Sequence, residues 1–406
     1  LAKALTATVA GAFHASSPPE TVNAAAYPYY LQGVAFMTRD NRSGDEAVPF
    51  FQKAIDLDGK SALVHAGLAE ALVQRSMMTG DKQKLAQAGV SIARAKSLNS
   101  DSVPVLLVSG LWNEQQSNYT NANQDFMRAI ELDSSNPDAW RRLANLYFVT
   151  ERPDLAIATY RQAIAARPDA YRPYLDLGTY YYGRGAFTDA EQLFRKVTTL
   201  VPGLQTGFTN LGGVLMSLGR FAEAEQTLIE ALRIGRTASA LSNLGALYNL
   251  QRRPVDALQM FQSALTLGSP NIAVYLNLAY AYRHLGRKQD ARSEYEKARS
   301  LAERELTADP KRSVPRASLA LASAFLGDKA RSEFEIGQAL SIAPGNPSVM
   351  RLAVLTYEAL DRREKTLSIL QNAPSTLLAS LNREPDLDGL HRDSRFVALL
   401  TDKPSQ

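Results

Sequence analysis

Apolar residues along the middle of the chain follow a pattern that repeats after about 34 residues. One copy contains Trp140, Leu143, Ala144, Tyr147, Ala156, Tyr160, Ala163 and Pro168, and the next contains Tyr174, Leu177, Gly178, Tyr181, Ala190, Phe194, Val197 and Pro202. Within each copy the apolar positions are three or four residues apart, which places them on one stripe of a helix, and two such stripes occur per copy. The pattern therefore predicts a pair of amphipathic helices in each copy.

Neither helix of a pair can bury its stripe alone, so the pairs must stack on one another. We expect Gly178 and Ala190 to face each other, because small residues allow the two helices of a pair to approach closely. Trp140 has the bulk to fill the space against a neighbouring pair, where full burial contributes roughly 1.5–3 kcal/mol. Pro168 and Pro202 are predicted to end the second helices, since proline lacks the N–H group and clashes with the preceding turn.

This order of large, small and helix-stopping residues resembles the tetratricopeptide repeat, a helix–turn–helix unit. Weaker copies extend the pattern in both directions, and we assign units to 61–102, 103–136, 205–237 and 238–271. The resemblance implies an all-α fold: a right-handed superhelical solenoid of about ten antiparallel helix–turn–helix repeats. In the unit after 271, the second helix is expected to continue through Glu303 towards Pro310.

The ends of the chain depart from the repeat and suggest three regions. Residues 1–19 are interpreted as the tail of an upstream domain and a linker, because Leu1, Leu5, Val9 and Phe13 suit a short amphipathic helix that Ser16–Pro19 ends. Residues 20–374 are assigned to the repeat array. Residues 375–406 do not follow the pattern and are predicted to form capping helices and a tail.

Two terminal motifs resemble the boundaries of helical-repeat regions in multidomain bacterial regulators, of which serine/threonine protein kinases are the most similar. These motifs are Tyr29-Tyr30-Leu31-Gln32-Gly33 and the tail from Pro385 to Phe396. Winged-helix transcription regulators and cyclase-like proteins have similar ends. The tail in those families usually reads Asp-Pro-Arg-Phe, whereas this chain has Ser394 in place of the proline. The resemblance implies the sensory or docking arm of a bacterial regulatory kinase.

Composition and motifs argue against catalysis within this chain. It contains no cysteine, and its four histidines lack metal-ligand spacing. A phosphate-binding loop, the complete kinase catalytic loop and the Asp-Phe-Gly motif are absent from the sequence. We therefore predict no enzyme activity, metal site or cofactor here. The net charge of +4 comes from basic residues interspersed with acids, which favours a solvated surface over a nucleic-acid face. No apolar stretch is long enough for membrane insertion, and the sequence leaves a cytoplasmic or periplasmic location open.

What remains is protein binding, and the resemblance implies that the first helix of each unit lines a concave groove. Residues expected to face it are Arg141, Asn145, Phe148, Arg172, Asp176, Thr179 and Tyr182. Asn210, Asn243 and Asn277 each precede a Leu-Gly or Leu-Ala pair in three successive units and could form a ladder of amides. An amide carries both a donor and an acceptor, so a ladder could hold the backbone of an extended peptide. A similar ladder occurs in protein O-linked N-acetylglucosamine transferases.

Three alternatives stay open at this point. Arg141 and Asn145 resemble the first pair of a carboxylate clamp for a chaperone tail, although Asp176 and Thr206 do not continue it. The chain could also be the substrate-selecting repeat region of a glycosyltransferase-type enzyme whose catalytic domain lies elsewhere. A purely structural assembly scaffold is the third.

Overall fold

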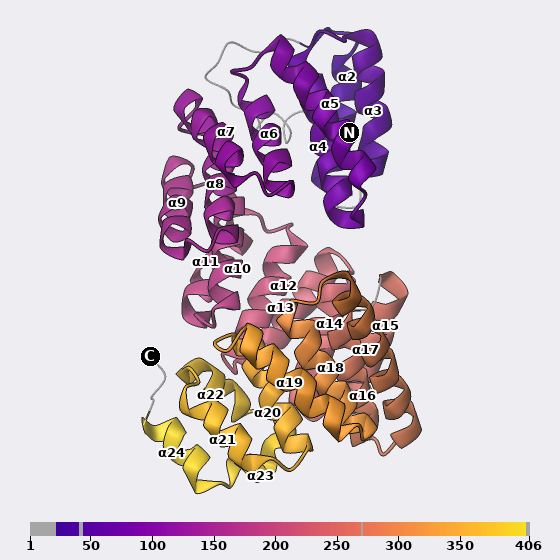
Figure 1. Ribbon diagram of the computed structural model, residues 1–406, viewed down its shortest axis with the longest axis vertical. Coiled ribbons are helices and arrows are strands. Elements are labelled where there is room, and N and C mark those ends of the chain that lie inside the picture. The colour runs from indigo at the N-terminus through magenta and orange to yellow at the C-terminus, as the bar shows by residue number, and fades with distance from the viewer. Residues whose placement is uncertain (1–21, 40–43, 269–270, 403–406) are drawn as a thin grey trace. The chain divides into compact units, whose positions relative to one another are not determined.

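The computed structural model describes residues 22–39, 44–268 and 271–402 (Figure 1). Within these ranges the regular structure consists of α-helices and one short 3-10 helix, with no strand, which confirms the all-α prediction. Among the described helices, none combines the length and the apolar character that crossing a membrane requires. The helix and linker predicted for residues 1–19 lie outside the described residues.

Within the described ranges the helices from α2 to α21 form ten consecutive pairs, as the repeat pattern predicts. The first helices of the pairs are α2 (Tyr27–Arg39), α4 (Ala62–Thr79), α6 (Val103–Gln115), α8 (Pro137–Val149), α10 (Tyr171–Gly183), α12 (Gln205–Ser217), α14 (Ala238–Leu250), α16 (Ile272–His284), α18 (Ser313–Leu326) and α20 (Pro347–Ala359). The second helices are α3 (Gly44–Leu57), α5 (Lys82–Leu98), α7 (Tyr119–Leu132), α9 (Pro153–Ala166), α11 (Phe187–Leu200), α13 (Phe221–Ile234), α15 (Pro254–Leu267), α17 (Lys288–Ala308), α19 (Lys329–Ile342) and α21 (Arg363–Gln371). Four short elements follow: α22 (Ser375–Leu381), the 3-10 helix η1 (Pro385–Leu387), α23 (Asp388–His391) and α24 (Ser394–Asp402).

Local chemistry explains where these helices begin and end. Asn136 caps α8 by accepting hydrogen bonds from the backbone N–H groups of Asp138 and Ala139, and Pro137 occupies the first turn, where no N–H donor is needed. The second helices α9 and α11 stop just before Pro168 and Pro202, as predicted. The expected extension of α17 is also confirmed, because this helix runs for 21 residues to Ala308.

The helices form two compact units, one ending at Pro173 and the other starting at Tyr174. We call them unit 1 and unit 2. Within each unit the first helices of successive repeats contact one another, for example α4 with α6 in unit 1 and α14 with α16 in unit 2 (Figure 1). Each unit therefore presents a face made of first helices, which is where the resemblance placed the groove.

Close packing inside a repeat depends on a glycine of the first helix and a large apolar residue of the second. A Cβ atom added to Gly178 would lie 2.8 Å from the Phe194 ring, and Gly245 stands in the same relation to Phe261 at 2.9 Å. Both rings are fully buried. The nearest atoms to Gly178 thus belong to Phe194, a larger neighbour than the small Ala190 expected from the sequence. The glycine makes room for the ring.

The chain after the tenth repeat has a small core of its own. Leu378, Leu387, Leu390 and Phe396 are buried together in unit 2, against residues of α20 and α21. This packing fixes η1 and α23, and it determines where the polar residues between Arg383 and Gly389 point.

Candidate protein-binding groove

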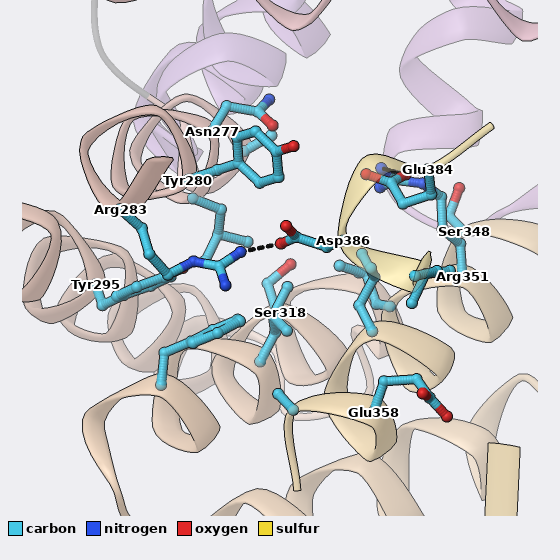
Figure 2. Close-up of a pocket in the computed structure, with 18 of the residues that line it drawn as sticks. Asn277, Tyr280, Arg283, Tyr295, Ser318, Ser348, Arg351, Glu358, Glu384 and Asp386 are labelled. Carbon is cyan, nitrogen blue, oxygen red and sulfur yellow. Dashed lines mark hydrogen bonds and ion pairs between the residues drawn. The ribbon is translucent and has the colours of Figure 1, made fainter. Parts of the chain in front are cut away.

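A pocket of about 520 Å³ lies on the first-helix face of unit 2 (Figure 2). Helices α16, α18 and α20 supply most of its walls, and residues of the segment 383–389 supply another. We call this segment the C-terminal strap. The apolar part of the pocket is lined by Leu276, Val314, Leu321, Phe325, Leu352 and Leu355.

Carboxylates of the C-terminal strap pair with basic side chains from three different repeats. Glu384 bonds Arg351 at 2.5 Å, Asp386 bonds Arg283 and lies 2.7 Å from the His284 ring nitrogen Nε2, and Asp388 bonds Arg252 at 2.9 Å. Figure 2 shows the Asp386 carboxylate pointing across the pocket at Arg283. Glu384 and Asp386 are largely shielded from solvent, whereas the Arg252–Asp388 pair is more than half exposed. The strap is therefore held most firmly at its Glu384 end.

Protonation states in this region favour these contacts. The bond from Arg252 lowers the pKa of Asp388, so this carboxylate stays ionised in all but strong acid. Burial and the adjacent Arg283 lower the pKa of His284, so its ring is neutral near pH 7. A neutral ring can still donate an N–H hydrogen bond to Asp386.

Backbone contacts anchor the two ends of the strap. The Arg383 guanidinium donates to the carbonyl oxygen of Ser217, the last residue of α12, at 2.5 Å. A cation at this position also complements the negative end of the helix dipole. At the other end, Arg363 donates to the carbonyl oxygen of Gly389 at 3.0 Å.

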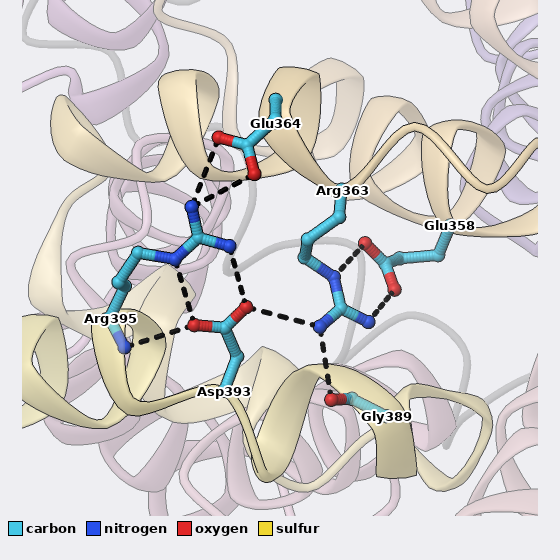
Figure 3. A network of polar contacts seen from close by, with 6 residues as sticks. All are labelled: Glu358, Arg363, Glu364, Gly389, Asp393 and Arg395. Carbon is cyan, nitrogen blue, oxygen red and sulfur yellow. Dashed lines mark hydrogen bonds and ion pairs between the residues drawn. The ribbon is translucent and has the colours of Figure 1, made fainter.

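Arg363 belongs to a wider polar network that holds α23 and α24 against α21 (Figure 3). Its guanidinium bonds Glu358 at 2.6 Å and Asp393 at 3.3 Å, and Arg395 bonds both Asp393 and Glu364 at 2.9 Å. Hydrogen bonds from Arg395 first, and from Arg363 in addition, hold the pKa of Asp393 far below its usual range.

Two polar side chains of α16 face the pocket beside the strap, Asn277 and Tyr280 (Figure 2). The Tyr280 hydroxyl is buried and has no hydrogen-bond partner among the described residues. Burial, together with the charge of Glu384, raises the pKa of Tyr280 to about 12, so the group remains a neutral donor. A buried hydroxyl without a partner is unfavourable, and a ligand entering the pocket could supply the missing acceptor.

Unit 1 has a pocket of its own, of about 420 Å³, between helices α2, α4, α6 and α8 and the start of α10. Arg142 bonds Glu70 at 2.6 Å and so links α8 to α4, while Arg141 bonds Asp138 at 2.9 Å. Burial opposes the ionisation of Asp138, but Arg141, Arg142 and Arg172 together lower its pKa. Apolar lining comes from Tyr30, Val34, Phe51, Leu63 and Leu107. The pocket combines an apolar wall with a cluster of arginines.

Comparison with known proteins identifies the repeat. Residues 94–314, more than half of the chain, match the family described as "Cilia and flagella-associated protein 70 C-terminal domain". The chain belongs to this tetratricopeptide-repeat family. Similarity to the yeast Tom70 crystal structure, with a TM-score of 0.53 at 16% identity over 81% of this chain and 72% of that one, agrees with the tetratricopeptide-repeat fold.

Two curated relatives match parts of the repeat array. Anaphase-promoting complex subunit 6 of Arabidopsis thaliana is 27% identical over 41% of this chain and 32% of its own length. Type IV pilus assembly protein PilF of Pseudomonas aeruginosa is 29% identical over 40% of this chain and 66% of its own length. This chain thus spans about a third of the plant relative and just under two thirds of the bacterial one. In general terms, this tetratricopeptide-repeat chain is a scaffold of the protein-interaction class.

The residues of unit 1 that were predicted to bind a partner fall into two groups, those that line the unit 1 pocket and those that do not. Arg141 and Arg172 both line the unit 1 pocket. Asn145 instead accepts a hydrogen bond from the Tyr160 hydroxyl, on the second helix of its own repeat, so its amide oxygen is engaged in local packing. Phe148 lies near the end of α8 with 44% of its surface exposed, and it is not part of the pocket lining.

Two of the predicted residues of α10 that belong to unit 2, Thr179 and Tyr182, make local contacts. The Thr179 hydroxyl donates to the Leu175 carbonyl oxygen of its own helix at 2.8 Å. The Tyr182 ring, 40% exposed, packs against the Phe187 ring with a centroid separation of 5.5 Å. Asp176 is half-buried. Tyr182 is the one among these three that offers a large exposed surface.

The three asparagines of the proposed ladder occupy equivalent positions on α12, α14 and α16 but have different surroundings. Asn243 donates to the carbonyl oxygen of Thr209, in the preceding repeat, at 3.4 Å. Asn277 lines the pocket beside the C-terminal strap, whereas Asn210 and Asn243 do not line it. Asn210 is half-buried on α12. The amide of Asn277 is therefore the best placed of the three to meet a ligand at that pocket.

Sequence reasoning missed the basic residues that hold the C-terminal strap, namely Arg252, Arg283 and Arg351. A usable signal existed in the alternation of Glu384, Asp386 and Asp388 along the tail. Carboxylates at every second position are unusual for a plain capping helix, because they do not share one helical face. The alternation could have suggested a segment that pairs with a row of cations.

Proposed function

We propose that this chain binds an extended protein segment on the face formed by the first helices of its repeats. The observation that carries the proposal is the C-terminal strap. A segment of the chain already crosses this face in unit 2, and side chains from several successive repeats hold it through carboxylates and carbonyl oxygens. A face that holds one segment in this way has the chemistry to hold another.

In unit 1 the proposed binding site is the pocket around Arg141 and Arg172. Its apolar wall would receive a hydrophobic side chain of the partner, and its arginines would bind backbone carbonyls or carboxylates. Arg172 is exposed and lies 6.0 Å from the Tyr171 ring, which also lines the pocket. Arginine and tyrosine are among the residue types that most often dominate the binding energy at interfaces. The relatives named as a complex subunit and an assembly protein also support a scaffold role.

We further propose that the scaffold serves as the docking arm of a bacterial regulatory kinase. This step rests on the two terminal motifs, Tyr29–Gly33 and Pro385–Phe396. Translation of the gene upstream of Leu1 tests it. A kinase core there supports the proposal, and a different output domain refutes it while leaving the scaffold unchanged.

The binding proposal is tested by comparing two charge reversals in unit 1. Arg172→Glu changes the pocket, whereas Arg161→Glu makes the same change at an exposed residue of α9 that does not line it. With the full chain as bait for quantitative affinity purification, we expect Arg172→Glu to reduce recovery of the specific partner about tenfold, as loss of a hot-spot residue does. Arg161→Glu should recover it at the wild-type level. Equal recovery with both variants would refute binding at this pocket.

A further inference from the structure

The C-terminal strap has a regular arrangement of charge. Glu384, Asp386 and Asp388 alternate with Pro385 and Leu387, and the two apolar residues are buried. Each carboxylate meets a basic side chain, and these belong to α20, to α16 and to the turn after α14. The groove of unit 2 thus binds an acid-x-acid-x-acid segment that has an apolar residue between its second and third acids.

One of these cations lies at a turn with positive φ, a position that Ser117, Glu151 and Asp361 occupy in other repeats. Arg252 has a φ of 56°, in the left-handed region that glycine adopts most easily, and Gly286 has a φ of 72° at the corresponding turn of the next repeat. In this conformation Arg252 reaches both Asp388 and the carbonyl oxygen of Pro385, at 2.9 and 3.2 Å. A long cationic side chain therefore replaces the favourable glycine at the turn that faces the strap.

The strap does not use all of the groove's binding groups. The pocket between the strap and the helices remains about 520 Å³ in volume, and the Tyr280 hydroxyl in it lacks a partner among the described residues. The Asn277 side chain lies beside it (Figure 2). A second segment could therefore make contacts that the strap leaves unmade.

We infer that the groove of unit 2 is a binding site for acidic protein segments with carboxylates at alternate positions, and that the C-terminal strap occupies it as an internal competitor. This inference rests on the proposed function and specifies the kind of partner. Release begins at the Asp388 end, where the ion pair is exposed and its loss leaves no buried charge unpaired. A competitor needs an apolar residue to replace Leu387, which is 1% exposed.

The test uses a fluorescent synthetic peptide with the sequence of residues 382–390, titrated by anisotropy into the full chain. The peptide is compared on the wild type and on a variant of the full chain with Glu384→Gln, Asp386→Asn and Asp388→Asn, which we call the receiving variant. These substitutions weaken the binding of the chain's own strap in the groove. We expect the peptide to bind this variant about tenfold more tightly than the wild type, because charge pairs of this kind carry coupling of that order or more. The same peptide with its three acids replaced by amides should not bind either chain.

Two controls keep the result interpretable. If the triple variant loses helicity, the single Asp388→Asn variant replaces it, since this side chain is 56% exposed and its change leaves the core intact. Adding Arg283→Ala to the receiving variant should abolish binding, whereas Arg233→Ala, at a 76% exposed arginine of α13, should not. Failure of the acidic peptide to bind a folded receiving variant, or equal binding of the amide peptide, would overturn the inference.

Failure here is distinguishable from failure of the proposed function. If the peptide does not bind while Arg172→Glu still loses the partner of unit 1, the scaffold function stands and the acidic specificity of unit 2 is refuted. If the peptide binds as expected while Arg172→Glu has no effect, the groove of unit 2 is established and the pocket of unit 1 is not the partner site.

Discussion

The same substitution at two glycines of helix α10 should have opposite effects on stability. Gly178→Ala would place a Cβ atom 2.8, 3.0 and 3.1 Å from three atoms of the Phe194 ring. Unstrained carbon contacts begin at about 3.5 Å, so the ring would have to retreat by about 0.7 Å, from 2.8 to 3.5 Å. Phe194 is 1% exposed and closely surrounded, which leaves it little room to move. Gly183, the last residue of the same helix, has no atom within 4 Å of an added Cβ.

The magnitude follows from comparing the two variants. Alanine favours a helix over glycine by up to about 1 kcal/mol at either position, so the helix term largely cancels in the comparison. What remains is overpacking at Gly178, which typically costs about 1–3 kcal/mol. In a body the size of unit 2, each kcal/mol shifts the melting midpoint by about 2–4 °C. Gly178→Ala should therefore melt several degrees below Gly183→Ala.

Circular dichroism at 222 nm during thermal unfolding is the assay. Midpoints are compared under one protocol, because repeat arrays need not unfold in a single two-state step. Gly183→Ala should melt at or slightly above the wild-type temperature. Equal midpoints for the two variants would mean that Gly178 does not pack against Phe194, and the repeat register would be wrong.

Three further predictions concern polar groups. Tyr280→Phe removes a buried hydroxyl that has no partner among the described residues. The free energy of unfolding, measured by chemical denaturation, should therefore be unchanged or higher by about 1–3 kcal/mol. A clear decrease in this free energy would show that the hydroxyl is bonded. Because the pKa of Asp393 is depressed in the fold, its charge stabilises the fold above the unfolded pKa of about 3.9. That stabilisation is lost as the pH falls through the pKa of the folded state. The difference in melting midpoint between wild type and Asp393→Asn should therefore be present at pH 7 and disappear in strong acid. A difference that does not change with pH would contradict this assignment. If the amide ladder binds peptide backbone, Asn210→Ala with Asn243→Ala should weaken partner recovery in affinity purification, and unchanged recovery would remove the ladder.

The helix pairs were predictable from the sequence because their causes are local. Spacing between apolar residues, capping by Asn136 and termination before Pro168 act within one repeat, and the chain carries about ten such units in series. Even the irregular length of α17 was predictable, because the sequence indicates a helix that continues through Glu303 towards Pro310. The position of Phe194 against Gly178 was harder to predict, since the pattern gives the face of a helix but not the depth to which a side chain reaches.

The C-terminal strap could not be placed from the sequence because its contacts are distant along the chain. Arg252 and Asp388 are separated by 136 residues, and Arg383 and Ser217 by 166. Periodicity carries no information about such pairs. Asn145 illustrates the reverse case, since its position on a first helix suggested the groove but the Tyr160 hydroxyl of the same repeat binds it.

Site-specific photocrosslinking tests the central claim, that the first-helix face binds a protein segment. A benzoylphenylalanine residue would replace Tyr171 or Tyr182 on the first helix α10, and Val90 or Val255 on the second helices α5 and α15, where these valines are 74% and 67% exposed. After irradiation in cells that contain the partner, adducts should form from the two tyrosine positions and not from the two valine positions. Adducts formed equally from all four, or only from the valine positions, would contradict the account.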